Sequence, residues 1–193
     1  YGVVAMDANG RVERFVEKPA PGTAPSNLIN AGTYVLEPSV LQRIEFGRKV
    51  SIEREIFPLI VEDGRLFAMA TDDYWIDTGR PEPYRRANLD MIDGVRRQMS
   101  APGVENGAKV HATALIEHSL VSSGAVIAPG ASIHDSVILS TAVIHADALV
   151  RDSIVMGTVG ERATIIDTVV GVAGVIADGA THEHAFVPDP SAV

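Results

Sequence analysis

The sequence predicts an α/β segment over residues 1–103 and a parallel β-helix over residues 104–193. In the first segment, short apolar runs of strand type alternate with runs that have helical spacing. In the second, an aliphatic residue with a small residue four positions later recurs five times. Ser100–Gly103 contains a Pro-Gly pair, which marks the boundary between the two segments.

The chain opens with a predicted β-hairpin. Val3–Met6 and Val12–Val16 flank the turn-rich tetrapeptide Asp7–Gly10. Because the first apolar run starts without an initiator Met, we expect Tyr1 to be an internal position of a longer protein. Further runs of strand type occupy Ala31–Leu36, Leu66–Ala70 and Tyr74–Ile76.

Three helices are expected in the same segment. Pro38 and Ser39 open a short one. Ser51 and the glutamates after it have the spacing of a helix start, although Pro58 has to be accommodated late in such a helix. Pro81–Met99 has helical spacing throughout and predicts one longer helix.

The repeats of the second segment give the most specific pattern in the sequence. The five units start at Val110, Ile127, Ile144, Val159 and Ile176, so their spacings are 17, 17, 15 and 17 residues. In most units a second aliphatic residue follows six positions later and a third lies five beyond it. Each unit therefore predicts three short strands around a triangular coil. The third unit is two residues short, so the spacing does not predict the conformation of its corner near Met156–Thr158.

Composition and charge exclude some classes of function and partner. The chain is 46% hydrophobic with a formal net charge of −9 and no cysteine, which fits a folded protein of a reducing compartment. Residues 110–193 contain two basic and nine acidic residues, so we expect no nucleic acid as partner. No apolar run is long enough to cross a bilayer, and we expect a cytoplasmic protein without a membrane partner.

Three motifs carry candidate chemistry. Phe15–Pro19 reads F-V-E-K-P and places Glu17 beside Lys18 at a strand end, although taken alone such a pair is more often a surface ion pair. Asn30–Val35 reads N-A-G-T-Y-V and adds an amide and the bare backbone of Gly32. Tyr74–Gly79 reads Y-W-I-D-T-G and adds Asp77, which taken alone is more often a turn cap than a metal ligand.

In order and spacing, these motifs resemble the sugar-phosphate-binding half of the sugar-1-phosphate nucleotidylyltransferases. Ser51–Pro58, S-I-E-R-E-I-F-P, resembles the GDP-mannose pyrophosphorylase branch, the mannose-1-phosphate guanylyltransferases. The resemblance implies that residues 1–103 form the C-terminal part of a Rossmann-like nucleotidyltransferase domain. It also implies that residues 104–193 form a left-handed parallel β-helix of hexapeptide repeats.

The resemblance also assigns roles. Gly2, Glu17, Asn30 and Gly32 would line the sugar site, with Glu17 accepting bonds from sugar hydroxyls. Lys18 would hold the sugar phosphate and Asp77 would bind Mg²⁺, which makes these two the catalytic residues. Each role suits its residue, since an ammonium pairs with phosphate and a carboxylate with hydroxyls or a hard cation.

The implied reaction transfers a nucleotidyl group from a nucleoside triphosphate, GTP in this branch, to a sugar 1-phosphate, here mannose 1-phosphate, and releases pyrophosphate. The Gly-rich nucleotide loop of the family does not occur in these 193 residues, so we expect the chain alone to be inactive. We also expect a homo-oligomer formed through the β-helix.

Two alternatives stay open. The substrate could be glucose 1-phosphate, with thymidylyl, uridylyl or adenylyl transfer. The chain could instead be a hexapeptide acyltransferase, because all six histidines lie in the repeat half and such enzymes use a His as base. Those residues are His111, His118, His134, His145, His182 and His184. The repeat places His111 and His145 on one outward corner and His118 and His184 on another, which favours a solvent face. We expect His182–His184 to form a terminal capping turn rather than a metal site.

Overall fold

A computed structural model describes residues 1–95 and 103–188. The chain forms two compact units, Tyr1–Trp75 and Ile76–Val193. The predicted domain limits of 1–103 and 104–193 differ from this division, because helix α2 (Pro81–Ile92) lies in the same compact unit as the β-helix. Most of the predicted boundary segment lies outside the described residues.

The first unit is built on the predicted hairpin. Strands β1 (Gly2–Met6) and β2 (Val12–Glu17) pair antiparallel, with Gly2 opposite Glu17 and Val4 opposite Phe15. The Asp7 carboxylate fixes the turn by accepting bonds from the backbone N–H groups of Asn9 and Arg11 at 2.8 and 2.9 Å. The hairpin prediction is therefore confirmed.

The other strands predicted for this unit do not form. Ala31–Leu36 and the segment around Tyr74 have no ladder partner among the described residues. Near Leu66–Ala70 the chain makes only an isolated bridge, Arg11 to Phe67. These strands were predicted from apolar content alone. A strand also needs a neighbouring strand that forms hydrogen bonds with its successive backbone N–H and C=O groups. Extended residues 28–30 instead bond to β1, where Val4 N–H reaches the Leu28 carbonyl at 2.9 Å.

Helical segments cover the hairpin. They are the 3-10 helix η1 (Pro38–Arg43), the π-helical turn η2 (Ile52–Ile56) and the α-helix α1 (Phe57–Glu62). The Ser51 side chain caps η2 by accepting a bond from Arg54 N–H, as its sequence pattern predicted. Pro58 fits because it stands in the first turn of α1, where its missing N–H costs no hydrogen bond. Ile56, Phe57 and Ile60 form the small core.

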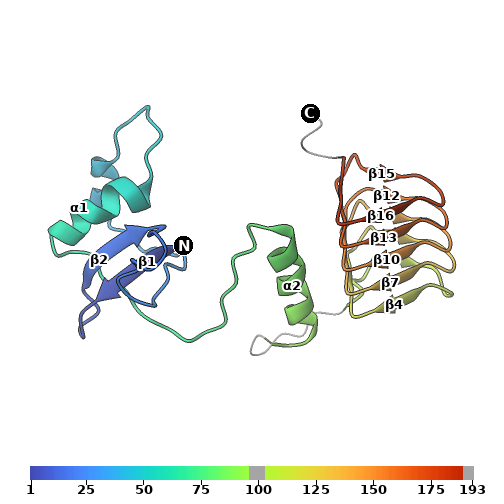
Figure 1. Cartoon of the computed structure of the whole chain (residues 1–193), viewed down its shortest axis with the longest axis horizontal. Helices are drawn as coiled ribbons and strands as arrows, with labels where there is room; N and C mark the ends of the chain where they lie inside the picture. Colours follow the sequence, from blue (N-terminus) through green and yellow to red (C-terminus); the bar gives the residue numbers. More distant parts are fainter. Residues whose placement is uncertain (96–102, 189–193) are drawn as a thin grey trace. The chain divides into compact units, whose positions relative to one another are not determined.

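The second unit is a parallel β-helix, seen as stacked coils in Figure 1. Three five-stranded sheets form its faces, and every strand pairs with those one coil away. The first sheet contains β3 (Lys109–Val110), β6 (Val126–Ile127), β9 (Val143–Ile144), β12 (Thr158–Val159) and β15 (Val175–Ile176). The second contains β4 (Leu115–Glu117), β7 (Ser132–His134), β10 (Leu149–Arg151), β13 (Thr164–Ile166) and β16 (Thr181–Glu183). The third contains β5 (Leu120–Val121), β8 (Val137–Ile138), β11 (Ile154–Val155), β14 (Val169–Val170) and β17 (Phe186–Val187).

The predicted repeat register is confirmed. Ile127 pairs with Ile144 in the first sheet, and Ile133 with Val150 in the second. These aliphatic side chains are 0–2% exposed and stack into one continuous core. The alanines four positions after each unit start are buried in the three central coils, because the corner leaves room only for a methyl group.

The short third coil is accommodated at one corner. Only Met156 and Gly157 connect β11 to β12, where the other coils use four residues. A Cβ on Gly157 would collide with the carbonyl oxygens of Gly171 and Gly174 in the next coil. The corner therefore requires glycine.

Helix α2 packs beside strand β5. Arg85 donates to the Asp135 carbonyl at 2.8 Å and to Asp152 Oδ1 at 2.9 Å, which fixes the helix to the β-helix corner. The helix ends at Ile92, with Gly94 at a φ of 67°. The prediction of a helix up to Met99 is thus wrong for residues 93–95, and residues 96–99 lie outside the described residues.

Candidate functional site

Three of the predicted sugar-site residues lie together at the open end of the hairpin. Gly2 pairs with Glu17 across the two strands, and Asn30 donates its backbone N–H to the Gly2 carbonyl at 2.8 Å. A Cβ on Gly2 would lie 2.7 Å from Glu17 Oε2 and 3.3 Å from Asn30 Cβ. Position 2 therefore has room only for glycine while both polar side chains keep their places.

Lys18 follows at the bend where β2 ends. Its φ of 51° lies in the left-handed region, and its N–H donates to the Tyr1 carbonyl at 3.2 Å. Its side chain is exposed and forms no ion pair with any side chain of residues 1–95 or 103–188. The surface-pair interpretation of Glu17 and Lys18 thus has no support, and the ammonium can take a phosphate.

The structure adds two residues that the sequence interpretation missed. Asn30 Nδ2 donates to Tyr34 Oη at 2.6 Å, and Tyr34 Oη donates to Glu53 Oε1 at 3.3 Å. Asn30 Oδ1 accepts the backbone N–H of Gly32 at 3.1 Å. Tyr34 stands four residues after Asn30 in the N-A-G-T-Y-V motif, and Glu53 lies in S-I-E-R-E-I-F-P. Two motifs that were interpreted separately are therefore joined by one hydrogen-bond chain.

The electrostatics keep Tyr34 protonated. Burial is the largest cause and raises the pKa of its phenol. The hydrogen bond from Asn30 acts in the opposite direction, and the carboxylates of Glu53 and Glu17 add to the rise. A phenol that holds its proton can donate to Glu53 while accepting from Asn30.

Trp75 anchors the neighbouring segment. Its indole Nε1 donates to the Ala31 carbonyl at 3.2 Å, and its ring meets Tyr1 edge to face with centroids 5.3 Å apart. Trp75 is the only tryptophan of the chain. Because it contacts the residue between Asn30 and Gly32, its fluorescence can report on ligands at this site.

Asp77 belongs to the second compact unit. Its side chain is exposed, and Oδ1 accepts the Gly79 N–H at 2.9 Å, so it acts as a turn cap. Within residues 1–95 and 103–188, no group of three or more His, Asp or Glu side chains could hold a metal ion. Asp77 as a single protein ligand of Mg²⁺ stays a prediction.

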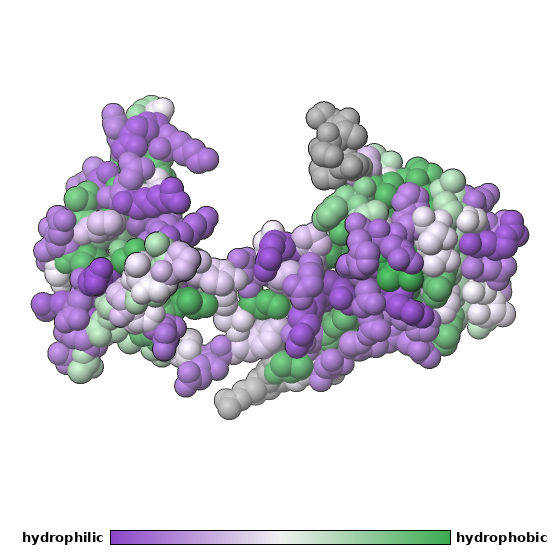
Figure 2. Space-filling view, viewed as in Figure 1, coloured by the Kyte–Doolittle hydropathy of each residue, from purple (hydrophilic) through white to green (hydrophobic). Residues whose placement is uncertain are grey.

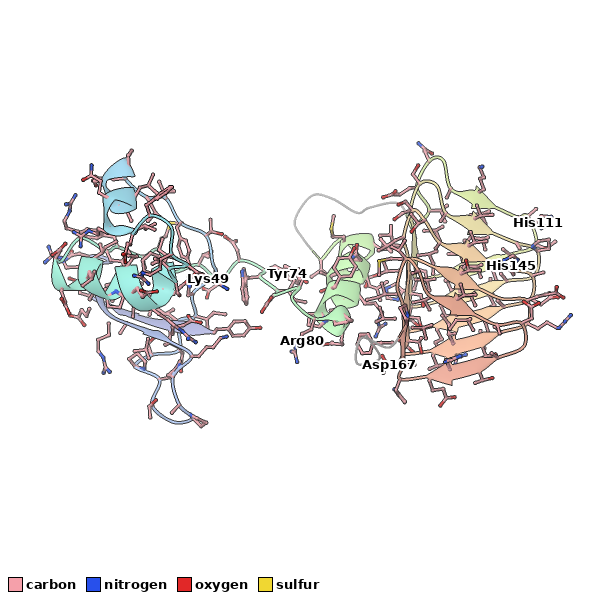
Figure 3. The ribbon with its side chains drawn as sticks, turned by 90° about the horizontal axis from the view of Figure 1, so that it is seen from above. Lys49, Tyr74, Arg80, His111, His145 and Asp167 are labelled. Carbon is pink, nitrogen blue, oxygen red and sulfur yellow. The ribbon has the colours of Figure 1, made fainter. Side chains whose placement is uncertain are left out.

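The histidines of the β-helix form polar columns on its outside. Figure 3 shows His111 and His145 along one edge and Asp167 at the edge nearer α2. His118 Nδ1 lies 2.5 Å from Asp135 Oδ1, and His184 Nδ1 lies 2.7 Å from Asp167 Oδ2, in each case one coil away. These pairs join neighbouring coils, as expected for the outward face of a solenoid.

His118 has a second partner at the C-terminal end of α2. Its Nε2 lies 3.2 Å from Asp93 Oδ2, just past the end of the helix. The hydrogen bond to Asp135 raises the pKa of His118, with a further contribution from Asp93 against the effect of burial. His118 thus bridges two carboxylates when it is protonated.

Comparison with known proteins divides the chain in the same way as its two kinds of sequence pattern. Residues 1–94 match the family model "Nucleotidyl transferase", and residues 103–183 match "GlmU-like, C-terminal hexapeptide". No helix in the described residues is long and apolar enough to cross a membrane.

Curated relatives are also found. The chain is 44% identical over 120 residues to the "Probable mannose-1-phosphate guanylyltransferase 3" of Oryza sativa, which covers 62% of the chain and 32% of the relative. It is 40% identical over 122 residues to the "Mannose-1-phosphate guanylyltransferase catalytic subunit beta" of Danio rerio, which covers 60% of the chain and 33% of the relative. The chain thus spans about a third of the length of these relatives.

The residues that carry the Gly2–Glu17–Asn30 cluster and the stacked coils each have a family match of their own. Residues 1–94 are thus similar to the nucleotidyl transferase family, and residues 103–183 are similar to the GlmU-like hexapeptide-repeat family.

Proposed function

We propose that the protein transfers a guanylyl group from GTP to mannose 1-phosphate, giving GDP-mannose and pyrophosphate, and that this chain supplies the sugar-phosphate side of the reaction. The observation that carries the proposal is the cluster of Gly2, Glu17 and Asn30 beside Lys18, whose ammonium has no ion-pair partner among the described residues. The names of the curated relatives support mannose 1-phosphate as the acceptor and guanylyl as the group transferred.

Each residue has a role that its chemistry supports. The Glu17 carboxylate accepts hydrogen bonds from sugar hydroxyls, and Asn30 adds an amide beside it. Lys18 places a positive charge against the sugar phosphate, whose oxygen attacks the α-phosphorus of the nucleotide. Because two anions must approach each other, positioning and charge neutralisation do most of the work.

Mg²⁺ would supply further positive charge between the two phosphates when it is bound. Asp77 fits as one ligand because its carboxylate is exposed and one of its oxygens is free of the bond to Gly79.

We further propose that the β-helix mediates self-association. Val172, Val175 and Phe186 around its last coil are 69%, 67% and 50% exposed, and Figure 2 shows hydrophobic residues reaching the surface of this part. Exposed apolar side chains at the end of a solenoid are suited to contact with a second copy of the chain. Light scattering should give a mass above that of a 20.5 kDa monomer, and a monomer at high concentration would contradict the proposal.

The transfer reaction is tested by pyrophosphate release in the intact protein. Release should require both GTP and mannose 1-phosphate, and glucose 1-phosphate should support it poorly. The 193-residue chain alone should release none, because the reaction needs a nucleotide loop that its sequence does not contain. Equal turnover with glucose 1-phosphate, or none with either sugar, would contradict the proposed acceptor.

A further inference from the structure

We propose that Glu53 and Tyr34 are positioning residues that orient the Asn30 side-chain amide, so that Asn30 presents an N–H group to a hydroxyl of the bound sugar. This inference rests on the proposed function, since it concerns the same sugar-phosphate site. It gives the S-I-E-R-E-I-F-P motif a role in sugar binding: Glu53 of this motif acts on Asn30 through Tyr34.

The direction of the hydrogen bonds follows from the chemistry of the groups. A carboxylate can only accept, so the Tyr34 hydroxyl must donate to Glu53 Oε1, 3.3 Å away. The lone pairs of Tyr34 Oη are then left to accept, and the Asn30 atom 2.6 Å from it must be the donor Nδ2. At the other end, Gly32 N–H donates to Asn30 Oδ1 at 3.1 Å. Both ends of the amide are thus assigned.

Glu53 and Tyr34, where this series of hydrogen bonds begins, are held in place by further contacts. Ser51 Oγ donates to Glu53 Oε2 at 3.1 Å while it also caps the turn η2. The Tyr34 ring packs edge to face on the buried Phe57 ring, with centroids 4.9 Å apart at 87°. The packed ring restricts where its hydroxyl can lie, so the carboxylate and the amide meet it at a defined place.

The consequence reaches the ligand. Only one N–H of the Asn30 amide has an acceptor among the described residues, so the second is available. Glu17, whose Oε2 lies against the same glycine as Asn30 Cβ, provides an acceptor nearby. One sugar hydroxyl can therefore accept from Asn30 and donate to Glu17. Without Tyr34 Oη, only the Gly32 N–H among the described residues holds the amide, so the N–H groups of Asn30 are less firmly directed toward the sugar.

The test compares Tyr34→Phe with the unchanged 193-residue chain, using Trp75 fluorescence to follow titrations with mannose 1-phosphate and with inorganic phosphate. Phenylalanine keeps the ring packed on Phe57 and removes only the hydroxyl. The affinity for mannose 1-phosphate should fall about tenfold. The affinity for inorganic phosphate should not change, because Lys18 holds it. Tyr84→Phe, in helix α2, is the matched control and should bind both ligands as the unchanged chain does.

A second readout follows the network itself. Glu53→Gln should lower the pKa of Tyr34, measured as the tyrosinate absorbance that Tyr34→Phe removes, because Glu53 contributes to raising it. A residue with only a packing role would not shift this titration.

The outcomes separate the two proposals. If the unchanged chain does not bind mannose 1-phosphate, the proposed function fails and the positioning role fails with it. If it binds and Tyr34→Phe binds equally well, or loses both ligands equally, only the positioning role is overturned. An unchanged Tyr34 pKa in Glu53→Gln also overturns it.

Discussion

Gly2→Ala separates binding from stability at the sugar site. The new Cβ would lie 2.7 Å from Glu17 Oε2, and ordinary contact begins near 3.4 Å, so the carboxylate must retreat by about 0.7 Å. Phe15 Cζ at 3.0 Å and Asn30 Cβ at 3.3 Å need to give only tenths of an ångström. Since the atom that moves most is the end of a flexible side chain, unfolding should become easier by only about 1 kcal/mol.

Binding should suffer more. A Glu17 carboxylate displaced from a sugar hydroxyl loses a charge-assisted hydrogen bond of about 1.5–3 kcal/mol, which is at least about a tenfold loss of affinity for mannose 1-phosphate. Trp75 fluorescence measures the affinity, and urea unfolding measures the stability. Gly171→Ala is the control, because its Cβ would meet nothing closer than 3.5 Å. Unchanged affinity in a folded Gly2→Ala chain would refute the placement of Glu17 in the sugar site.

Three further predictions concern other parts of the chain. Gly157→Ala should destabilise the β-helix by about 3 kcal/mol, because backbone carbonyls block its Cβ. The control Gly171→Ala should stay within about 1 kcal/mol of the original chain. Urea unfolding followed by circular dichroism measures both, and equal effects would contradict the corner geometry. The folded-state pKa of His118 is raised, so its bridge should stabilise fully below the unfolded pKa of about 6.5 and less as the pH rises through the folded value. The difference in urea midpoint between the chain and His118→Gln should shrink over that range, and a difference that grows with pH would have the wrong sign. Asp77→Asn should abolish most pyrophosphate release in the intact protein without unfolding it, and near-normal release with unchanged Mg²⁺ dependence would remove Asp77 from the site.

The β-helix was predictable because its information is local and repeated. Four of the five coils contribute an aliphatic residue to each of the three sheets at nearly fixed spacing, so the pairing of Ile127 with Ile144 could be expected from the sequence. The short coil was visible as a missing pair of residues. How it closes, with Gly157 pressed against the next coil, depends on backbone contacts that no spacing reveals.

The first unit was less predictable, because its elements depend on partners far away in the sequence. Ala31–Leu36 has the composition of a strand but forms no β-ladder with any described residue. Its apolar content therefore misled the prediction. The end of α2 was missed for the opposite reason: the apolar spacing continues to Val95, while Gly94 already ends the helix locally.

The candidate site shows the same limit. Glu17 and Asn30 were found from motifs and Gly2 from the family resemblance, and the structure brings the three together. Tyr34 and Glu53 were missed because they stand 19 residues apart and meet only after the helical turn at Ser51 has packed against the hairpin. The tyrosine four positions after Asn30 was the available signal. Lys18 is placed beside the cluster, whereas the metal role of Asp77 stays a prediction.

The central claim, that the first unit binds a sugar 1-phosphate through Lys18, is tested most directly by Lys18→Ala. Mannose 1-phosphate and GTP are titrated separately into the intact protein and its variant. The affinity for mannose 1-phosphate should fall by about 1.5–3 kcal/mol, the value of one charge-assisted bond, while the affinity for GTP stays the same. An equal loss for both ligands, or no loss for mannose 1-phosphate, would contradict the account.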